Sequence, residues 1–316
     1  MNSTGVLVFT DERLAEYNFG ETHPFGPSRF YAFLERFVRM DFAEAVQKGA
    51  SREALPEELE WFHTHDYVEF VRRASERGDV YLDDGDTPSY VGVFEAAGRV
   101  VGTTLSGIEK ILNKECRRAF SPIAGMHHGR RDRAGGFCVF NDCGVAIEML
   151  RRKFGVRRVA YVDIDAHHGD GVYYSFESDP DLTIVDFHED GRFLYPGTGH
   201  RHETGKGPAA GTKLNIPMSI GADDGDFLEA WSRAEEFLDR SEPEFILFQC
   251  GVDSLEGDPL THLCYTEKIH AHVAERLCLL ADRHCSGRLL AMGGGGYNLE
   301  NIATGLNAVI GAMVRN

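Results

Sequence analysis

Residues 159–172 read VAYVDIDAHHGDGV, and this stretch decides the fold class. The run 159–163 is apolar until its last position and rich in β-branched and aromatic residues, a pattern typical of a strand buried on both faces of a parallel sheet. Polar residues follow it directly, and in such sheets functional sites lie beyond the carboxyl ends of the strands. The stretch therefore predicts an α/β protein with a functional site at the end of this strand.

Similar short apolar runs alternate with longer helical patterns on both sides of this stretch. The alternation predicts a central, mostly parallel sheet with helices on both faces. No internal repeat and no low-complexity linker interrupts it, so residues 1–316 are predicted to form a single domain. The predicted strands are 6–9, 159–163, 182–187, 213–216, 245–250 and 289–292, and the predicted helices are 28–48, 88–112, 143–154, 226–238, 266–284 and 299–314.

The composition is that of a packed globular chain. With 42% hydrophobic and 11% aromatic residues, the 316-residue chain is too apolar for disorder. Its net charge of −17 argues against nucleic-acid binding, which needs a basic face. No apolar run has the ~20 residues of a membrane span, and the first 17 residues lack the basic region of a signal peptide. The seven cysteines form no C-x-x-C pair, which is typical of reduced thiols in the cytoplasm. Together these features predict a soluble cytoplasmic protein with neither nucleic acid nor membrane as partner.

Metal-ligand residues follow two of the predicted strands. Asp165 and His167 follow the run 159–163, and their spacing places both on one side of an extended segment. Asp253 follows the run 245–250. Carboxylate and imidazole together suit Zn²⁺ or Fe²⁺, and a catalytic site keeps three protein ligands and one open position. The spacing therefore predicts a metal site, in preference to the helix capping that an isolated D-x-H would indicate.

Two histidines and two further carboxylates predict acid–base chemistry. His127 and His128 are adjacent, whereas Asp163 and Asp170 lie on either side of the Asp165–His167 pair without an obvious ligand role. A hydrogen bond from imidazole to carboxylate orients the ring and raises its basicity towards neutral pH. We therefore expect two His–Asp dyads.

A glycine run, 293–296, follows the last predicted strand and leads into Tyr297. Glycines let the backbone approach a ligand closely, and the tyrosine hydroxyl is suited to donate to a developing oxyanion. A phosphate-binding loop is disfavoured because Asn298 stands where a third glycine is required and no G-K-[ST] follows. The sequence also lacks G-x-S-x-G and H-E-x-x-H, the signatures of common serine hydrolases and zinc proteases.

Five segments, in order along the chain, resemble the histone deacetylase family, and most of all its bacterial histone-deacetylase-like and acetoin-utilisation amidohydrolases. The likeness begins near His23 and Arg29 and covers nearly the whole chain. It implies an arginase/deacetylase-like three-layer fold and a zinc-dependent hydrolase that uses a metal-bound water to cleave an N-acetyl or other N-acyl amide of a lysine-like amine. The segments are HHGRRDRAGGFCVFND (127–142), YVDIDAHHGDGV (161–172), FHEDGRFLYPGTG (187–199), GVDSLEGDP (251–259) and GGGGYN (293–298).

The resemblance also implies roles for individual residues. His128 is the implied general base and acid, His127 has an electrostatic role, and Tyr297 donates a hydrogen bond to the carbonyl oxygen. The implied metal ligands are Asp165, His167 and Asp253, for Zn²⁺ or Fe²⁺, and the implied dyad partners are Asp163 and Asp170. The implied substrate-binding residues are the tunnel walls Phe137 and Tyr195, Gly136 beside them, Asp86 at the rim, Leu260 at the gate, and Arg29 at an internal acetate-side cavity. A structural K⁺ or Na⁺ is implied beside Asp163, Asp165, His167, Asp186 and Phe187.

Three positions depart from the family pattern. Tyr195 replaces the usual phenylalanine, which brings a hydroxyl to the tunnel mouth. Asp186 replaces a serine, and its extra carboxylate is expected to tighten the monovalent cation site or change its preference. Leu260 stands where a polyamine-selective relative carries glutamate, which disfavours acetylpolyamines without excluding them.

Other functions stay open at this point. A two-metal ureohydrolase shares the fold, but it needs carboxylates where this chain has Gly169 and Gly251. A non-catalytic acetyl-lysine binder is disfavoured because Tyr297 and both histidines are present. Acetylated lysine side chains, acetylpolyamines and other small acetylated amines all remain possible substrates. The acyl-chain length, the choice between Zn²⁺ and Fe²⁺ and the oligomeric state are left undetermined.

Overall fold

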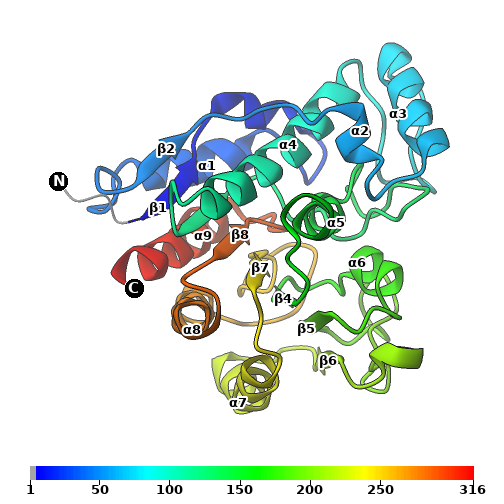
Figure 1. Cartoon of the computed structure of the whole chain (residues 1–316). Coiled ribbons are helices and arrows are strands. Elements are labelled where there is room, and N and C mark those ends of the chain that lie inside the picture. The colour runs from blue at the N-terminus through cyan, green and yellow to red at the C-terminus, as the bar shows by residue number, and fades with distance from the viewer. Residues whose placement is uncertain (1–4) are drawn as a thin grey trace.

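One sheet of eight strands forms the centre of the computed structural model, which describes residues 5–316 (Figure 1). Neighbouring strands pair in parallel throughout, in the order β2-β1-β3-β8-β7-β4-β5-β6, so the predicted α/β class is confirmed and the sheet is wholly parallel. The strands are β1 (Val6–Phe9), β2 (Gln47–Gly49), β3 (Arg118–Ser121), β4 (Val159–Asp163), β5 (Leu182–Glu189), β6 (Lys213–Met218), β7 (Phe245–Gln249) and β8 (Leu289–Met292).

Helices cover both faces of the sheet and make it the middle of three layers (Figure 1). Successive strand residues point to opposite faces: in β4, Tyr161 packs into the core beneath α4 and α5, whereas Val162 packs into the core beneath α7, α8 and α9. No helix within residues 5–316 is long and apolar enough to cross a membrane. The helices are α1 (Ser28–Phe37), α2 (Pro56–Leu59), α3 (His65–Arg77), α4 (Val93–Leu112), α5 (Asp142–Phe154), α6 (Asp170–Ser175), α7 (Asp224–Arg240), α8 (Glu267–His284) and α9 (Leu299–Arg315), with 3₁₀ turns η1 (Glu12–Glu16) and η2 (Gly207–Ala209).

The predicted helix 28–48 is wrong beyond Phe37, where α1 ends. The next residues form turns, and the chain then enters the edge strand β2. Ala43 and Val46 are nonetheless buried in the core, and Phe42 packs on Phe37 with ring centroids 6.2 Å apart. These apolar residues continue the helical spacing of α1 although the chain no longer forms a helix, which explains the error.

The start of the predicted helix 88–112 and the number of strands also need correction. Pro88 forms a β-bridge with Tyr81, and Gly92 has φ +94°, so α4 begins only at Val93. The strands β2 and β3 escaped prediction because each has only three or four residues and carries polar positions.

The carboxyl ends of the central strands bring their following loops together. Beyond the strands, Ile164 N–H donates to the carbonyl of Gln249 at 3.1 Å, and Cys250 N–H donates to the carbonyl of Met292 at 2.9 Å. Gly293 N–H likewise donates to Ser121 at 2.9 Å. These bonds extend the sheet past β4, β7, β8 and β3, so the loops that carry the predicted functional residues start side by side.

Candidate metal and acid–base site

Asp165, His167 and Asp253 converge at the carboxyl ends of β4 and β7. One ligand atom from each lies within 4.8 Å of the others; Asp165 and Asp253 are buried, and the His167 side chain is 12% exposed. His167 Nδ1 is 3.1 Å from Asp165 Oδ1 and 3.1 Å from Asp253 Oδ2. Among residues 5–316 this is the one group of three or more such side chains with that spacing. The structure therefore brings together the three residues that the sequence predicts as ligands.

Donors outside the group hold the other oxygen of each carboxylate. Asp165 Oδ2 accepts hydrogen bonds from Gln249 Nε2 and from Gly295 N–H, each at 2.8 Å. Asp253 Oδ1 accepts one from Ala166 N–H at 2.8 Å. Because these bonds fix both carboxylates, Asp165 Oδ1 and Asp253 Oδ2 are turned towards His167. Such outer contacts orient ligands in metal sites.

The charge of this group suits a divalent cation. Both carboxylates are almost fully buried, and burial together with the neighbouring Asp165 raises the pKa of Asp253 to about 7. Two buried carboxylates need a compensating positive charge. Burial lowers the pKa of His167, but Asp165 and Asp253 outweigh it and raise this pKa to about 10, so protonated His167 supplies that charge when no metal is bound. Two oxygen ligands and one nitrogen ligand also match Zn²⁺ or Fe²⁺. The residues present therefore fit a single transition-metal ion.

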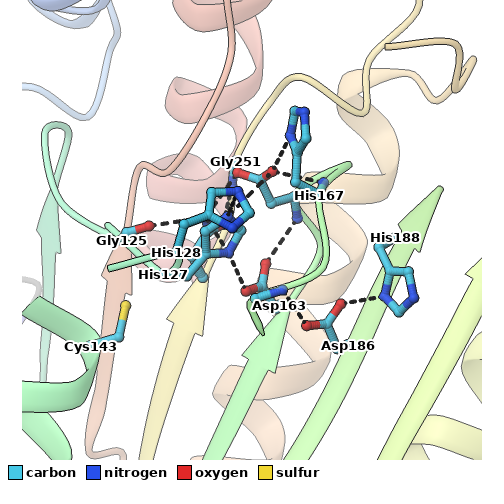
Figure 2. Close-up of polar contacts among 12 residues, drawn as sticks. Gly125, His127, His128, Cys143, Asp163, His167, Asp186, His188 and Gly251 are labelled. Carbon is cyan, nitrogen blue, oxygen red and sulfur yellow. Dashed lines mark hydrogen bonds and ion pairs between the residues drawn. The ribbon is translucent and has the colours of Figure 1, made fainter. Parts of the chain in front are cut away.

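Two His–Asp dyads lie next to this group, as predicted, and Figure 2 shows His127 beside Asp163. His127 Nδ1 is 2.8 Å from Asp163 Oδ2, and His128 Nδ1 is 2.8 Å from Asp170 Oδ1. The two Nε2 atoms are 3.1 Å apart, so the imidazoles face each other. Since each Nδ1 has a carboxylate partner, both Nε2 atoms remain for contacts inside the site.

The two imidazoles have opposite pKa shifts. Burial lowers the pKa of His128 to about 4, and the charge of His127 acts in the same direction. Burial would also lower the pKa of His127, but the carboxylates of Asp163 and Asp165 outweigh it and raise this pKa to about 10. In the metal-free site these shifts favour a charged His127 and a neutral His128 that is able to accept a proton.

Tyr297 joins the same site from the glycine run. Its N–H donates to Asp258 Oδ2 at 2.7 Å, which sets the start of the turn into α9. A small cavity of about 20 Å³ is lined by Tyr297, His127, His128, Asp165 and His167, together with Phe25, Gly125, Met126, Gly136, Cys138, Gly294 and Gly295. A volume of this order holds about one water molecule. The cavity is therefore lined by two of the three metal-ligand residues, by both dyad histidines and by the tyrosine.

Close packing requires glycine at position 136, beside this cavity. Gly136 has φ +52°, and a Cβ atom there would lie 2.4 Å from His128 Cδ2. Any side chain would push the imidazole away from the cavity. The predicted place of Gly136 next to the substrate path agrees with this contact.

A larger pocket of about 730 Å³ lies outside the small cavity and shares His128 with it. Asp86 and Tyr195, both predicted to bind substrate, line this outer pocket, and the Tyr195 ring lies 5.0 Å from the His128 ring. Burial and the neighbouring Asp83 raise the pKa of Asp86 to about 6. Phe137, also predicted to bind substrate, lines neither cavity, and its ring lies 5.8 Å from that of Tyr297.

Two further predicted substrate-binding residues, Leu260 and Arg29, also lie away from the cavity walls. Leu260 is half-buried and is not among the residues that line either cavity, so the structure gives no support for a gate there. Arg29 is buried and binds the glycine run, with Nη2 2.7 Å from the carbonyl of Gly294 and Nε 2.8 Å from that of Gly296. Within the described chain its Nη1 has no partner. The structure thus shows Arg29 as a support of the glycine run.

Asp186, predicted beside a monovalent cation, already has two partners. Its Oδ1 is 2.6 Å from His188 Nδ1, and its Oδ2 accepts a hydrogen bond from Gly169 N–H at 2.9 Å (Figure 2). Asp186 pairs in register with Asp163 of β4, which places it next to the dyad. Phe187 points the other way and packs on Phe227, with ring centroids 4.4 Å apart.

Sequence reasoning missed several supports of the site. The Tyr161 hydroxyl donates to Asp163 Oδ2 at 2.6 Å, and Arg130 Nη2 donates to Asp170 Oδ2 at 2.6 Å. Asp142 accepts hydrogen bonds from the backbone N–H groups of Gly125 at 3.0 Å and Met126 at 2.7 Å and so holds the segment before His127. Tyr161 was recognisable from its spacing of two before Asp163, which places both on one face of the strand. Arg130 and Asp142 carried no signal, because their partners are remote in sequence.

Known proteins share this architecture. A family model described as "Histone deacetylase domain" matches residues 23–313. The acetoin utilization protein AcuC of Bacillus subtilis (strain 168) is 39% identical over 297 residues, covering 90% of this chain and 76% of the relative. AcuC of Staphylococcus aureus (strain MSSA476) is 32% identical over 309 residues, covering 95% and 79%. The crystal structure of the HDA15 HD domain superposes with a TM-score of 0.90 at 27% identity, covering 98% of this chain and 88% of that one.

These comparisons agree with the geometry of the site. The matched range 23–313 includes the metal-ligand group, both dyads and Tyr297. The similarity to the HDA15 domain covers the same eight-stranded arrangement from end to end. The chain therefore belongs to the histone deacetylase domain family.

Proposed function

We propose that this chain is a metal-dependent deacetylase that hydrolyses the N-acetyl amide of a lysine-like amine to free amine and acetate, or another N-acyl amide to free amine and the corresponding carboxylate. The observation that carries the proposal is the shared cavity of Asp165, His167, both dyad histidines and Tyr297. Family membership supports the reaction class. Zn²⁺ is the proposed metal, with Fe²⁺ as the alternative. We further propose one catalytic domain over residues 1–316 and a cytoplasmic location, which the seven free cysteines support.

The residues of this chain have distinct tasks in such a reaction. Asp165, His167 and Asp253 would hold the metal ion, which when bound would supply Lewis-acid polarisation of a carbonyl and a lowered pKa for a water molecule. His128 is neutral, and since Asp170 holds its Nδ1, its Nε2 accepts the proton of the attacking water and later donates a proton to the leaving amine. The Tyr297 hydroxyl donates to the carbonyl oxygen as negative charge develops there.

His127 has a different task because its pKa shifts in the opposite direction to that of His128. Asp163 and Asp165 raise the pKa of its imidazole, which favours the positively charged form, and its Nδ1–H donates to Asp163. A fixed positive charge beside the cavity stabilises the developing oxyanion without taking part in proton transfer. The two histidines thus divide electrostatic stabilisation and proton transfer between them.

The geometry disfavours a two-metal ureohydrolase. A Cβ atom at Gly251 would lie 2.0 Å from Asp165 Oδ2, so no carboxylate fits at this position while Asp165 keeps its place. A Cβ atom at Gly169 would lie 2.9 Å from Asp163 Oδ2. A non-catalytic acetyl-lysine binder is disfavoured because it would not need the proton-transfer pair His128–Asp170.

The pH profile is expected to report the lowered pKa of His128. The base is active when neutral, and the neutral form is populated above its pKa, so kcat/KM should fall only as pH decreases through a value below 6.5. A bound cation has the same sign as protonated His128 and lowers this pKa further. Steady-state kinetics from pH 4.5 to 9, with the metal content measured at each pH, checks this. An acid limb above pH 6.5 in metal-replete enzyme contradicts the assignment.

We also propose a K⁺ or Na⁺ site beside Asp163, Asp165, His167, Asp186 and Phe187. Burial lowers the pKa of His188, but Asp186 outweighs it and raises this pKa, so the carboxylate already has His188 as a hydrogen-bond partner. Asp186→Ser is expected to lower the free energy of unfolding by about 3 kcal/mol, because it leaves His188 buried without its partner. If K⁺ binds at this site, the wild type should melt at a higher temperature in KCl than in choline chloride. Asp186→Ser should make this difference in melting temperature smaller. Equal melting temperatures of the wild type in both salts contradict the cation site.

A substrate panel with defined metal tests the proposed function. Chain loaded with Zn²⁺ or with Fe²⁺ is incubated with acetyl-lysine peptides, acetylated polyamines and arginine, and released acetate and urea are measured separately. The expected product is acetate, with His128→Ala as the inactive control. Urea without acetate would favour the ureohydrolase. The absence of acetate from every acetamide would refute the proposal.

A further inference from the structure

The outer pocket of about 730 Å³ carries charges of both signs. Residues Asp83 to Asp86 line it from one loop, and Arg130 and Arg133 line it from another, with His128 and Asp170 among the remaining lining residues. Its volume lies within the range of about 300–1,000 Å³ that is typical of small-molecule sites. The inference drawn from it rests on the proposed function, because the pocket shares His128 with the small cavity.

The acidic loop offers two of its three carboxylates to a ligand. Asp83 is used by the loop itself, since its Oδ1 accepts hydrogen bonds from the N–H groups of Gly85, Asp86 and Thr87 at 3.0, 3.1 and 2.9 Å. Asp84 is exposed, whereas the Asp86 carboxyl lies 3.1 Å from the Thr87 hydroxyl and also contacts the Asp83 carboxyl and the Phe137 N–H. Neither forms an ion pair with another side chain of residues 5–316. An ammonium group in the pocket would therefore have two carboxylates available.

The basic wall offers one unpaired arginine. Arg130 is occupied, with its Nη2 2.6 Å from Asp170 Oδ2 and its guanidinium over the Tyr174 ring. Arg133 is held beside it through the backbone, since Arg130 N–H donates to the Arg133 carbonyl at 2.8 Å. The Arg133 side chain is exposed and has no carboxylate within ion-pair distance in the described part of the chain. In a chain with a net charge of −17, an unpaired arginine in this pocket suits an anionic group of the ligand.

We propose that the substrate is a free diamino acid acetylated on its side-chain amine, with its α-carboxylate bound by Arg133 and its α-ammonium bound by Asp84 and Asp86. The acetamide end then reaches inward to His128 and Tyr297. An acetylated polyamine has only positive groups to offer, and Arg133 repels them. A lysine within a peptide has neutral amides in place of both charges and loses both contacts.

Three compounds with the same acetamide and chain separate the two charges. Nε-Acetyl-L-lysine carries both, N-acetylcadaverine keeps only the ammonium, and 6-acetamidohexanoate keeps only the carboxylate. We expect kcat/KM for Nε-acetyl-L-lysine to exceed each of the others by about ten-fold, the size of one charge-assisted hydrogen-bonded contact. An acetyl-lysine tripeptide with blocked ends and glycine neighbours is the neutral comparison and should also be poorer.

The variant Arg133→Gln tests whether Arg133 binds the α-carboxylate of the substrate. It should lower the ratio of kcat/KM for Nε-acetyl-L-lysine to that for N-acetylcadaverine about ten-fold, partly by removing the repulsion of the second compound. Arg233→Gln removes the same charge from an exposed arginine on α7 that lines a different cavity, and it should leave this ratio unchanged. Calorimetry of product binding gives a second readout, in which L-lysine should bind more tightly than cadaverine to the wild type but not to Arg133→Gln.

The results distinguish this inference from the proposed function. If acetate is released and kcat/KM for N-acetylcadaverine or for the tripeptide equals or exceeds that for Nε-acetyl-L-lysine, the diamino-acid substrate is overturned. The proposed deacetylase function would still stand. The same ratio in wild type and Arg133→Gln would overturn the role of Arg133. If no acetamide were hydrolysed, the proposed function would fail, and equal binding of L-lysine and cadaverine would then overturn this inference as well.

Discussion

Asp253→Asn is expected to abolish metal binding and, with it, the hydrolysis of acetamides. Asparagine has nearly the same shape and keeps the acceptor for Ala166 N–H, but it removes the negative charge that faces His167. Loss of an outer partner of a metal ligand costs about 10–100-fold in affinity, so loss of a charged ligand should cost at least about 100-fold. Metal content after dialysis and acetate release, measured on the same sample, check this result.

The stability of the metal-free variant tests whether the substitution disrupts the fold. Burial and Asp165 raise the pKa of Asp253, so neutralising this side chain relieves repulsion in the metal-free protein. Metal-free Asp253→Asn should therefore unfold at the same temperature as metal-free wild type or higher. Asp41→Asn, at an exposed carboxylate in a turn, should retain metal and activity. Full metal occupancy in Asp253→Asn would mean that Asp253 is not a ligand.

Tyr297→Phe is expected to lower kcat by about 10²–10³-fold, the usual effect of removing one oxyanion donor. The phenyl ring keeps the packing against Phe137 and beside Arg29, so the cavity should retain its shape. The metal-ligand group does not include Tyr297, so metal content should match that of the wild type.

The control for this variant is Tyr31→Phe, which removes the same hydroxyl from an exposed tyrosine of α1. It should leave kcat unchanged. A loss of activity in Tyr297→Phe that came with lost metal would indicate a structural role. Unchanged kcat with full metal would show that another group stabilises the oxyanion.

The fold class and the site were accessible from the sequence because both depend on local patterns. Buried parallel strands are nearly continuous apolar runs, and Asp165, His167 and Asp253 follow such runs directly. Their convergence then follows from the rule that parallel strands gather their carboxyl ends on one edge of the sheet. The assigned roles of these residues remain predictions until they are measured.

Features that depend on distant partners were not accessible. Gln249 binds Asp165 across 84 positions, and Arg130 binds Asp170 across 40, and neither residue belongs to a local pattern that predicts its partner. The pairing of Asp186 with His188 is local, but it became meaningful only when the register placed Asp186 beside Asp163. Apolar spacing alone predicted a helix at 38–46, where the chain instead forms turns that bury the same residues as a helix would.

The most direct test of the account is a metal titration of the metal-free chain, with acetate release from an acetyl-lysine substrate measured at each step. Because Asp165, His167 and Asp253 form a single ligand group, we expect activity to rise in proportion to added Zn²⁺ and to level off at one equivalent per chain. Loss of activity on chelation and its return on adding metal back complete the expected result. Activity that requires two equivalents, or acetate release that persists without metal, would contradict a single-metal deacetylase.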